Sequence, residues 1–471
     1  MKKAISIILM VSFLVLSLSA CAKDSTESAG NTTDNTSSDN QTTQAAATPE
    51  VTQGAKTDEK PVEIEFWHAL GGTLGDTLLA IVDEYNASQS KYIIKPVTLG
   101  SYSEIDQKLQ AAYAAKNTPA LVVGGNQDTF YQKGLVEAFE DYMPADYNKS
   151  DIVGGFLEAA TKDGKMVFAP AYGTSQVLYY NKAVLEEAGY TVADLSSWQS
   201  IEGMKSKIIG IETSPNKIGY VWEPMWGYYN MADVVSSAGG KYLSEDGKTV
   251  LINDATWVEV FDQFRTWIND EKSMAIHSGG QGWEYWYKTM DDWVYGISLG
   301  YTGSPGDYTI ALDAVKKAKA EGYKNEFACA IQPGWKNNAP APYFSSLMYF
   351  MPKSSNVTDD MRKGAAEFVT YATNTANTAR FSMGTGYVAV RKSVLDLPEY
   401  KSYLEENPDA DVALKQIDQY AVPDFIDPTG GAIFQALTEA VDKIQIENVS
   451  AKKALDEAAK KAQAALDKVN K

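Results

Sequence analysis

Strands and helices alternate near the start of the folded part of this chain, and this alternation limits the fold more than any other feature. Residues 62–67, 92–97 and 120–123 have the short apolar or alternating patterns that are typical of strands. Between them, residues 74–85 and 103–116 repeat apolar side chains at helical spacing. Because strands joined by helices pair in parallel, the sequence predicts the α/β class.

The ends of the predicted strands give the first candidate ligand-binding residues. In open α/β sheets, ligands bind outside the carboxyl ends of the strands. His68, Tyr102, Asn126 and Asp128 follow the three predicted strands and are therefore candidates by position. We expect His68 to form a hydrogen bond at the end of its strand rather than to contact a ligand.

The first 20 residues have the pattern of a secretory signal peptide. Lys2 and Lys3 precede an apolar stretch over 4–18, and small residues follow it. The segment Leu18-Ser19-Ala20-Cys21 matches the bacterial lipobox, which predicts removal of residues 1–20 and lipidation of Cys21. An ordinary cleaved signal with an incidental cysteine is the alternative. A membrane-spanning helix is disfavoured because it needs roughly 20 apolar residues.

Residues 21–60 form a polar segment that predicts a disordered tether. The segment is rich in Ser, Thr, Asn, Gln, Asp and Ala, and the first aromatic residue after Cys21 is Phe66. Such a composition buries too little apolar area to offset the entropy lost on ordering. We therefore expect a folded body on a leash, anchored by lipid to the extracellular face of the bacterial membrane.

The body, residues 61–471, is long enough for two domains. The formal net charge of −19 argues against a nucleic-acid partner, whose phosphates need a basic surface. With Cys21 lipidated, Cys329 has no partner for an internal disulfide. His68 and His277 are the two histidines and lie far apart in the sequence, so we assign no metal site and no cofactor.

Four short segments carry a family resemblance when they are taken together. IEFWHALGG (64–72), GSYSE (100–104), QVLYYNK (176–182) and GYVAVRK (386–392) occur in the order seen in extracellular solute-binding proteins of carbohydrate ABC importers, family 1. The resemblance implies a two-lobe α/β fold of type II, with a ligand cleft at a hinge between the lobes. It also implies a monomer that delivers its ligand to ABC permease subunits in the membrane.

The resemblance also implies that the chain crosses between the lobes more than once. We expect crossings near 171–173, near 300–304 and after Met351. The first lobe would then comprise residues 61–172 and about 302–353. The second lobe would comprise residues 173–301 and about 354–471.

Within that family, the first two segments most resemble the receptor for glycerol 3-phosphate and its diesters. Tyr102 and Tyr387 stand where that receptor has tyrosines near its ligand. Asn126 replaces an acidic residue, PYFSSL (342–347) replaces a glycine-containing loop, and the phosphate-contacting arginine falls near Asp427, where this chain has no basic residue. A phosphate needs Arg, Lys or a glycine-rich helix N-terminus, so we predict a neutral sugar and keep glycerol phosphates as the alternative.

Aromatic residues in the middle of the chain are candidates for stacking on sugar rings. Glycine and proline separate many of them, which places them in or beside loops, although each ring could equally pack a core. Trp222, Trp226 and Trp283 are the leading stacking candidates, and polar side chains would bind the hydroxyl groups. The predicted ligand-binding residues are Tyr102, Asn126, Asp128, Thr174, Trp222, Trp226, Trp283, Tyr301, Tyr343 and Tyr387.

Two other classes of protein fit parts of the pattern less well. A surface glycoside hydrolase would share the aromatic residues and the export signal, but it needs two carboxylates about 5 to 10 Å apart. Asp291 and Asp292 are adjacent and ordinary for a surface, and no carboxylate pair stands out. An adhesin would usually carry repeats, and this chain shows none. We therefore expect a binding protein rather than an enzyme.

Overall fold

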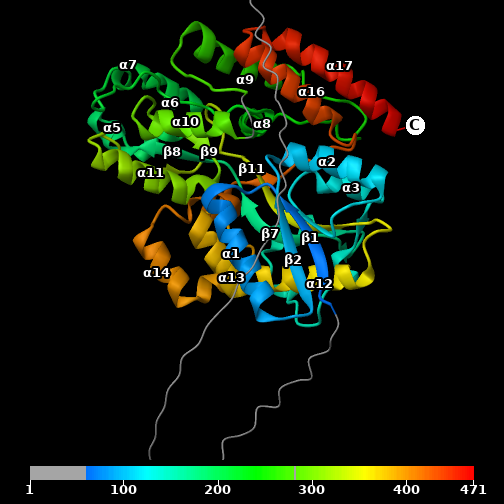
Figure 1. The fold of residues 1–471 in the computed structure, drawn as a ribbon. Coiled ribbons are helices and arrows are strands. Elements are labelled where there is room, and N and C mark those ends of the chain that lie inside the picture. Colours follow the sequence, from blue (N-terminus) through cyan, green and yellow to red (C-terminus); the bar gives the residue numbers. More distant parts are fainter. Residues whose placement is uncertain (1–59, 280–282, 471) are drawn as a thin grey trace, which may run out of the picture. The chain divides into compact units, whose positions relative to one another are not determined.

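The computed structural model describes residues 60–279 and 283–470 (Figure 1). The predicted signal peptide, the lipidation site Cys21 and the tether up to residue 59 lie outside the described residues. Residues Glu59–Lys471 form one compact unit. Within the part that the structure describes, no helix is both long enough and apolar enough to span a bilayer.

The first five elements match the alternation of the sequence. Strand β1 (Val62–His68) pairs in parallel with β2 (Tyr92–Thr98) and with β3 (Leu121–Val123). Helices α1 (Gly72–Ser88) and α2 (Tyr102–Ala115) connect these strands. The predicted α/β class and the parallel pairing are therefore confirmed.

A long strand, β11 (Tyr343–Pro352), joins several distant segments to this sheet. It runs antiparallel to β3, to β7 (Ala169–Thr174) and to β4 (Val136–Glu137), and parallel to β12 (Val422–Pro423). The main path of the sheet is β12-β11-β3-β1-β2. The sheet is therefore mixed, and the strand that pairs with four others, β11, lies more than 200 residues after β3 in the sequence.

A second, smaller sheet has three strands. Strand β8 (Val177–Asn181) lies between β9 (Gly300–Gly303) and β10 (Phe327–Ala330), and both pairings are antiparallel. Gly300 is required here by packing, because a Cβ atom would lie 2.4 Å from the Tyr179 carbonyl oxygen and 2.5 Å from the Trp222 ring. The glycine-rich segment 300–304 therefore begins as a buried strand.

These pairings place the lobe boundaries differently from the sequence expectation. The expected boundary at residue 302 would divide β9 and would assign β10 to the first lobe, yet both strands pair with β8. Helix α12 (Asp359–Ala372), expected in the second lobe, packs against β1. We propose a first lobe of residues 60–174 and 343–385, and a second lobe of residues 177–330 and 432–470.

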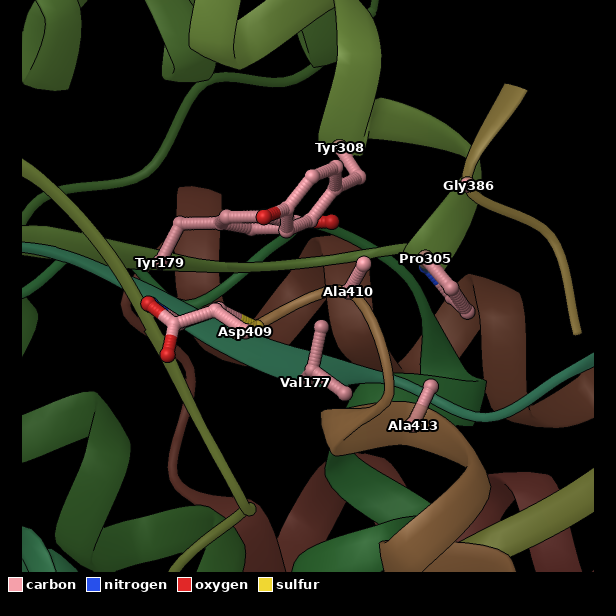
Figure 2. Close-up of a pocket in the computed structure, with 9 residues that line it drawn as sticks. Val177, Tyr179, Pro305, Tyr308, Gly386, Asp409, Ala410 and Ala413 are labelled. Atoms are coloured by element: carbon pink, nitrogen blue, oxygen red, sulfur yellow. The ribbon is translucent and has the colours of Figure 1, made fainter. Parts of the chain in front are cut away.

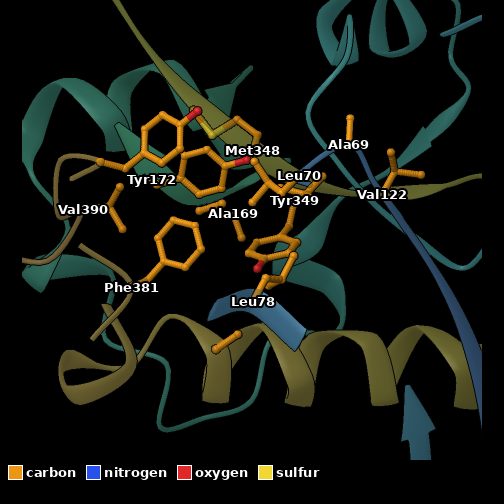
Figure 3. Packing of buried hydrophobic residues seen from close by; sticks show 14 of the residues in the cluster. Ala69, Leu70, Leu78, Val122, Ala169, Tyr172, Met348, Tyr349, Phe381 and Val390 are labelled. Atoms are coloured by element: carbon orange, nitrogen blue, oxygen red, sulfur yellow. The ribbon is translucent and has the colours of Figure 1, made fainter. Parts of the chain in front are cut away.

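The larger sheet packs in a first buried core, whereas the smaller sheet contributes to two cores, with Tyr179 in the first and Leu178 in the second. Figure 3 shows part of the first core, where side chains such as Leu78 from α1, Tyr172 from β7 and Tyr349 from β11 pack together. The second core includes Trp198 and Trp257. Helices α16 (Ala432–Val441) and α17 (Ala451–Val469) pack on each other and close this core. The two-lobe α/β architecture is thus present.

The remaining elements are short helices and hairpin strands around the two cores. The helices are α3 (Gln127–Gln132), α4 (Gly154–Ala160), α5 (Lys182–Glu187), α6 (Trp198–Gly203), α7 (Lys205–Ile208), α8 (Tyr228–Ser237), α9 (Ala255–Arg265), α10 (Glu284–Val294), α11 (Tyr308–Ala320), α13 (Thr375–Thr385), α14 (Pro398–Glu406) and α15 (Val412–Gln419). The strands are β5 (Thr161–Lys162) and β6 (Lys165–Met166).

Candidate functional site

Aromatic side chains from the two lobes touch each other beside the first turn of α2. Tyr102 is the first residue of α2, and its hydroxyl lies 3.4 Å from that of Tyr172 in β7. The Tyr102 ring meets the Trp283 ring edge-on, with 5.8 Å between the centroids. Trp283 immediately precedes α10, which packs against the smaller sheet. The structure therefore brings together two predicted ligand-binding residues that are 181 positions apart in the sequence.

Three more rings continue this group on the second lobe. Trp226 meets Tyr285 edge-on at 4.8 Å, and the Tyr285 hydroxyl lies 3.4 Å from the Tyr229 hydroxyl. The Trp226 Nε1 donates a hydrogen bond to Asp442 Oδ1 at 2.8 Å. We call Tyr102, Trp226, Tyr229, Trp283 and Tyr285 the aromatic wall. All of its members except Tyr285 retain some solvent-exposed surface.

Carboxylates lie next to the aromatic wall, beginning with Asp106. This residue follows Tyr102 by one turn of α2, and its Oδ1 accepts a hydrogen bond from the Asn126 backbone N–H at 2.8 Å. Burial raises the pKa of Asp106 to about 6, against the effects of that hydrogen bond and of the Lys133 charge. The Asn126 side chain lies next to Gly431, where a Cβ atom would be 3.3 Å from its Nδ2.

Asp424 adds a second carboxylate from a distant part of the chain. Its surface is exposed, yet desolvation by the surrounding protein raises its pKa to about 6, and the charge of Asp128 adds to this. Asp128 itself forms an ion pair with Lys162, with 2.8 Å between Oδ1 and Nζ.

Tyr228 marks the place where these charges converge. Burial raises the pKa of its hydroxyl, and the charges of Asp424, Asp427 and Asp106 raise it further. Its ring lies edge-on to that of Tyr229, 5.8 Å away, which connects it to the aromatic wall. We call Asp106, Asp128, Asp424 and Asp427 the acidic cluster.

Asp427 occupies the N-terminus of α16, where an anion would otherwise be favoured. Its Oδ1 accepts hydrogen bonds from the backbone N–H (2.8 Å) and the hydroxyl (2.6 Å) of Thr429, and its Oδ2 accepts one from the Ile433 N–H at 2.9 Å. Backbone N–H groups at a helix start are a common site for phosphate. Here the protein's own carboxylate takes that position, near which the resemblance places a phosphate-contacting arginine.

The raised pKa of Asp106 gives a prediction for stability. An aspartate with a raised folded pKa disfavours the fold when it ionises, so this cost is absent below about pH 4 and is fully present above about pH 6. We expect Asp106→Asn to raise the free energy of unfolding at pH 7 by up to about 1 kcal/mol, after discounting for solvent, and to change it little at pH 4.

Urea unfolding at pH 4, 5, 6 and 7 measures this effect. Asp76→Asn, at an exposed position in α1, serves as the control. At each pH we expect this variant to have the same free energy of unfolding as the wild type. The assignment would be wrong if Asp106→Asn changed stability equally at pH 4 and pH 7.

Two predicted ligand-binding residues lie in the interior instead. Trp222 has 0% of its surface exposed, and its Nε1 donates a hydrogen bond to Thr302 Oγ1 at 3.2 Å. Tyr301 is also 0% exposed, stacks on Tyr179 at 5.2 Å and donates to Asp307 Oδ2 at 3.1 Å. Both side chains are surrounded by other protein side chains, so Trp222 and Tyr301 are core residues and the prediction that they contact a ligand is withdrawn.

The other three predicted residues lie at the ends of the segments that connect the proposed lobes. Tyr387 is largely buried and lies 4.5 Å from the Tyr172 ring, close to Tyr102. Thr174 ends β7 and pairs with Ser345. Tyr343 begins β11, and its backbone N–H donates to Asp233 Oδ1 at 2.9 Å. Tyr387 thus adjoins the aromatic wall, whereas Thr174 and Tyr343 are partly exposed and form no hydrogen bond or ring contact with the described residues of the wall.

Asp307 is a supporting residue that the sequence analysis missed. Its Oδ2 accepts hydrogen bonds from Trp286 Nε1 at 2.8 Å and from the Tyr301 hydroxyl. Burial raises its pKa to about 7, against the effect of these hydrogen bonds. By fixing Trp286 in the first turn of α10, it positions the neighbouring Trp283. Its position after the sequence GSPG carried no signal of this role.

Two further residues have structural roles. His68 is fully buried, and its Nε2 lies 3.2 Å from Thr98 Oγ1, which agrees with a hydrogen-bonding group at the strand end. Burial lowers its pKa to about 4. Arg391 donates to the backbone carbonyls of Thr373 (2.7 Å) and Asn148 (2.6 Å), and it stands over the Tyr147 ring.

A small cavity lies away from the aromatic wall (Figure 2). It has room for roughly one water molecule. Its lining contains none of the predicted ligand-binding residues and consists of Val177, Tyr179, Pro305, Tyr308, Cys329, Gly386, Asp409, Ala410 and Ala413. It is too small for a sugar, so we place the candidate site at the aromatic wall and the acidic cluster.

Known proteins share both the sequence pattern and the fold. Residues 80–409 match the model of the bacterial extracellular solute-binding protein family. The sn-glycerol-3-phosphate-binding periplasmic protein UgpB of Rhizobium meliloti (strain 1021) is 25% identical over 369 residues, which cover 75% of this chain and 81% of that protein. The UgpB of Agrobacterium fabrum is also 25% identical over 369 residues, covering 75% and 80%.

Two solved structures have the same two-lobe fold. UgpB from Mycobacterium tuberculosis, solved in complex with glycerophosphocholine, superposes with a TM-score of 0.74 at 20% identity and covers 86% of this chain and 98% of its own. The cyclic alpha-maltosyl-1,6-maltose binding protein from Arthrobacter globiformis has a TM-score of 0.65 at 21% identity and covers 87% and 100%. The two-lobe type II fold is therefore confirmed, and the chain belongs to the bacterial extracellular solute-binding protein family.

Proposed function

We propose that this protein is the substrate-binding lipoprotein of an ABC importer, which captures a neutral sugar or oligosaccharide and delivers it to a membrane permease. Lipid on Cys21 and the tether over residues 21–60 would hold the body at the extracellular face of the cell membrane. The protein would work as a monomer, and we expect ligand release rather than chemical turnover.

The observation that carries this proposal is the meeting of the aromatic wall with the acidic cluster. Rings such as Trp283 can stack on the apolar faces of a sugar. Carboxylates such as Asp106 and Asp424 accept hydrogen bonds from sugar hydroxyls more strongly than neutral groups do. Lys162, the basic residue paired with the cluster, is already neutralised by Asp128 at 2.8 Å. Lys133, whose charge acts on Asp106, is a further basic residue nearby, so the site offers mainly acceptors and ring faces.

The same charges disfavour a phosphate. A phosphate dianion near Tyr228 would lie close to Asp106, Asp424 and Asp427, whose charges act on the Tyr228 hydroxyl. Like charges repel, so these carboxylates would weaken phosphate binding. The α16 N-terminus, which could bind an anion, is taken by Asp427. Uptake of glycerol 3-phosphate or its diesters remains the second candidate, because the relatives named UgpB bear that ligand in their names.

Binding would bring one lobe over the ligand. In the aromatic wall, Tyr102 belongs to the first lobe, and Trp226 and Trp283 belong to the second. A ligand bound between Tyr102 and these two tryptophans would therefore contact both lobes. Segments 175–176, 331–342 and 386–431 connect the proposed lobes and are the expected hinge. Domain closure around a ligand is a common motion of proteins with this architecture.

A thermal-shift screen of residues 59–471 tests the proposal. The panel holds neutral monosaccharides, neutral oligosaccharides, glycerol 3-phosphate and glycerophosphocholine. A ligand at a hundred times its Kd adds about 2.7 kcal/mol of stability, which moves the Tm by about 2 °C or more. We expect a shift with a neutral saccharide and none with glycerol 3-phosphate. A shift with the phosphate compounds alone would overturn the proposed ligand class but not the receptor role.

A further inference from the structure

Glu223, His277 and Asp292 meet in the second lobe, away from the aromatic wall. Glu223 extends the smaller sheet, where its backbone N–H donates to the Gly300 carbonyl at 3.0 Å. Asp292 lies in the last turns of α10, and His277 lies in the connection that precedes this helix. Three segments that are separate in the sequence thus present one imidazole and two carboxylates to the same point.

The spacing of their ligand atoms suits a metal ion. His277 Nε2 lies 2.9 Å from Asp292 Oδ2 and 3.7 Å from Glu223 Oε2. One ligand atom from each of the three residues lies within 4.8 Å of the other two. Ligand atoms placed about 2.1 Å from a tetrahedral zinc ion are about 3.4 Å apart. The two distances from His277 Nε2, 2.9 and 3.7 Å, lie on either side of that value.

The Glu223 carboxylate is buried, and among the described residues its one ion-pair partner is His277. The residue is 0% exposed, and neither of its carboxylate oxygens has a hydrogen-bond partner among the described residues. The hydroxyl of Ser298, also fully buried and unpaired, lies beside it. Within the described ranges, His277 is the one residue that forms an ion pair with either carboxylate. A buried carboxylate without compensation is costly, and a divalent cation would supply the missing charge.

We propose that Glu223, His277 and Asp292 bind one divalent transition-metal ion of the zinc class. One imidazole and two carboxylates suit zinc, whereas calcium takes six to eight oxygen ligands. Three protein ligands leave the fourth tetrahedral position for water. The ion would tie the edge of the smaller sheet to α10, the helix that Trp283 immediately precedes.

The two histidines, His68 and His277, lie far apart in the sequence, so the sequence alone predicts no metal site. The structure instead joins one histidine to two carboxylates that lie 54 and 15 positions away in the sequence. No short spacing motif marks such a set. This inference does not depend on which solute the protein carries, since none of the three residues belongs to the aromatic wall or the acidic cluster.

Calorimetric titration of the purified, chelator-treated full chain with ZnCl2 tests the proposal. We expect one bound zinc per chain and a higher Tm with zinc than without. Asp292→Asn and Glu223→Gln should each weaken zinc binding by about tenfold or more. The matched control is Asp291→Asn, which removes the exposed neighbouring carboxylate on α10 and should keep the wild-type zinc affinity. Titrations with MgCl2 and CaCl2 should show much weaker binding.

The outcomes that would overturn the proposal are equally specific. Wild-type protein that binds no zinc would exclude the site. Zinc affinity that is unchanged in Glu223→Gln and Asp292→Asn, or reduced equally in Asp291→Asn, would place any bound zinc elsewhere. We expect Glu223→Gln to fold, because it removes a buried unpaired charge, and its Tm without zinc should equal or exceed that of the wild type.

Discussion

Replacing Trp222 by alanine should lower the free energy of unfolding by about 3 to 5 kcal/mol. The side chain is fully buried, meets Trp198 edge-on at 6.3 Å and donates its Nε1–H to Thr302. Alanine would leave a large cavity in the second core and an unpaired Thr302 hydroxyl, and close-packed interiors relax only partly around such a loss. Ligand affinity of the folded protein should change little.

Urea unfolding followed by fluorescence measures this loss, and calorimetry of the folded fraction measures affinity. Trp222→Phe is the control, because it keeps an aromatic ring in the core and should cost clearly less than alanine. The position assigned to Trp222 would be contradicted if Trp222→Ala kept wild-type stability but lost ligand binding.

Replacing Trp283 by alanine should weaken ligand binding strongly and lower stability only a little, which is the reverse of the effect expected for Trp222→Ala. We expect affinity for the saccharide found by screening to fall tenfold or more, with a loss of stability much smaller than for Trp222→Ala. Trp283 is partly exposed and touches Tyr102 from the other lobe, so its removal takes away both a stacking face and a contact between the lobes. Trp226→Ala should also weaken binding, although it additionally breaks the hydrogen bond to Asp442.

Isothermal titration calorimetry of each variant measures these affinities. Tyr287→Ala is a matched control, because this aromatic residue lies on the same helix, α10, with 42% of its surface exposed and outside the aromatic wall. We expect the control to bind as the wild type does. Unchanged titrations for both Trp283→Ala and Trp226→Ala would remove the aromatic wall from the binding site.

The part of the fold that local periodicity controls could be predicted from the sequence. The strands at 62–68 and 92–98 and the helices after them are each built from side chains near in sequence, so their patterns are legible. The sequence does not predict the position of strand β11 in the sheet, because that position depends on pairing with β3, β4, β7 and β12. Such long-range pairing leaves no periodic mark of its own.

The candidate site divides in the same way. Asn126 and Asp128 follow β3 and are predicted by position; in the structure the Asn126 backbone N–H bonds to Asp106, and Asp128 lies in the acidic cluster. Trp222 and Trp283 both lie in segments rich in glycine and proline, so local context could not tell a core ring from an accessible one. Asp424 joins the acidic cluster only through the tertiary fold, since it lies 318 positions after Asp106.

The crystal structure of residues 59–471 with the bound saccharide tests the central claim most directly. We predict that the sugar lies between the lobes, with a ring face on Trp283 or Trp226 and hydroxyl groups within hydrogen-bond distance of Asp106 or Asp424. A ligand bound elsewhere, or a phosphate held by basic residues at this site, would contradict the proposal that the aromatic wall and the acidic cluster bind a neutral sugar.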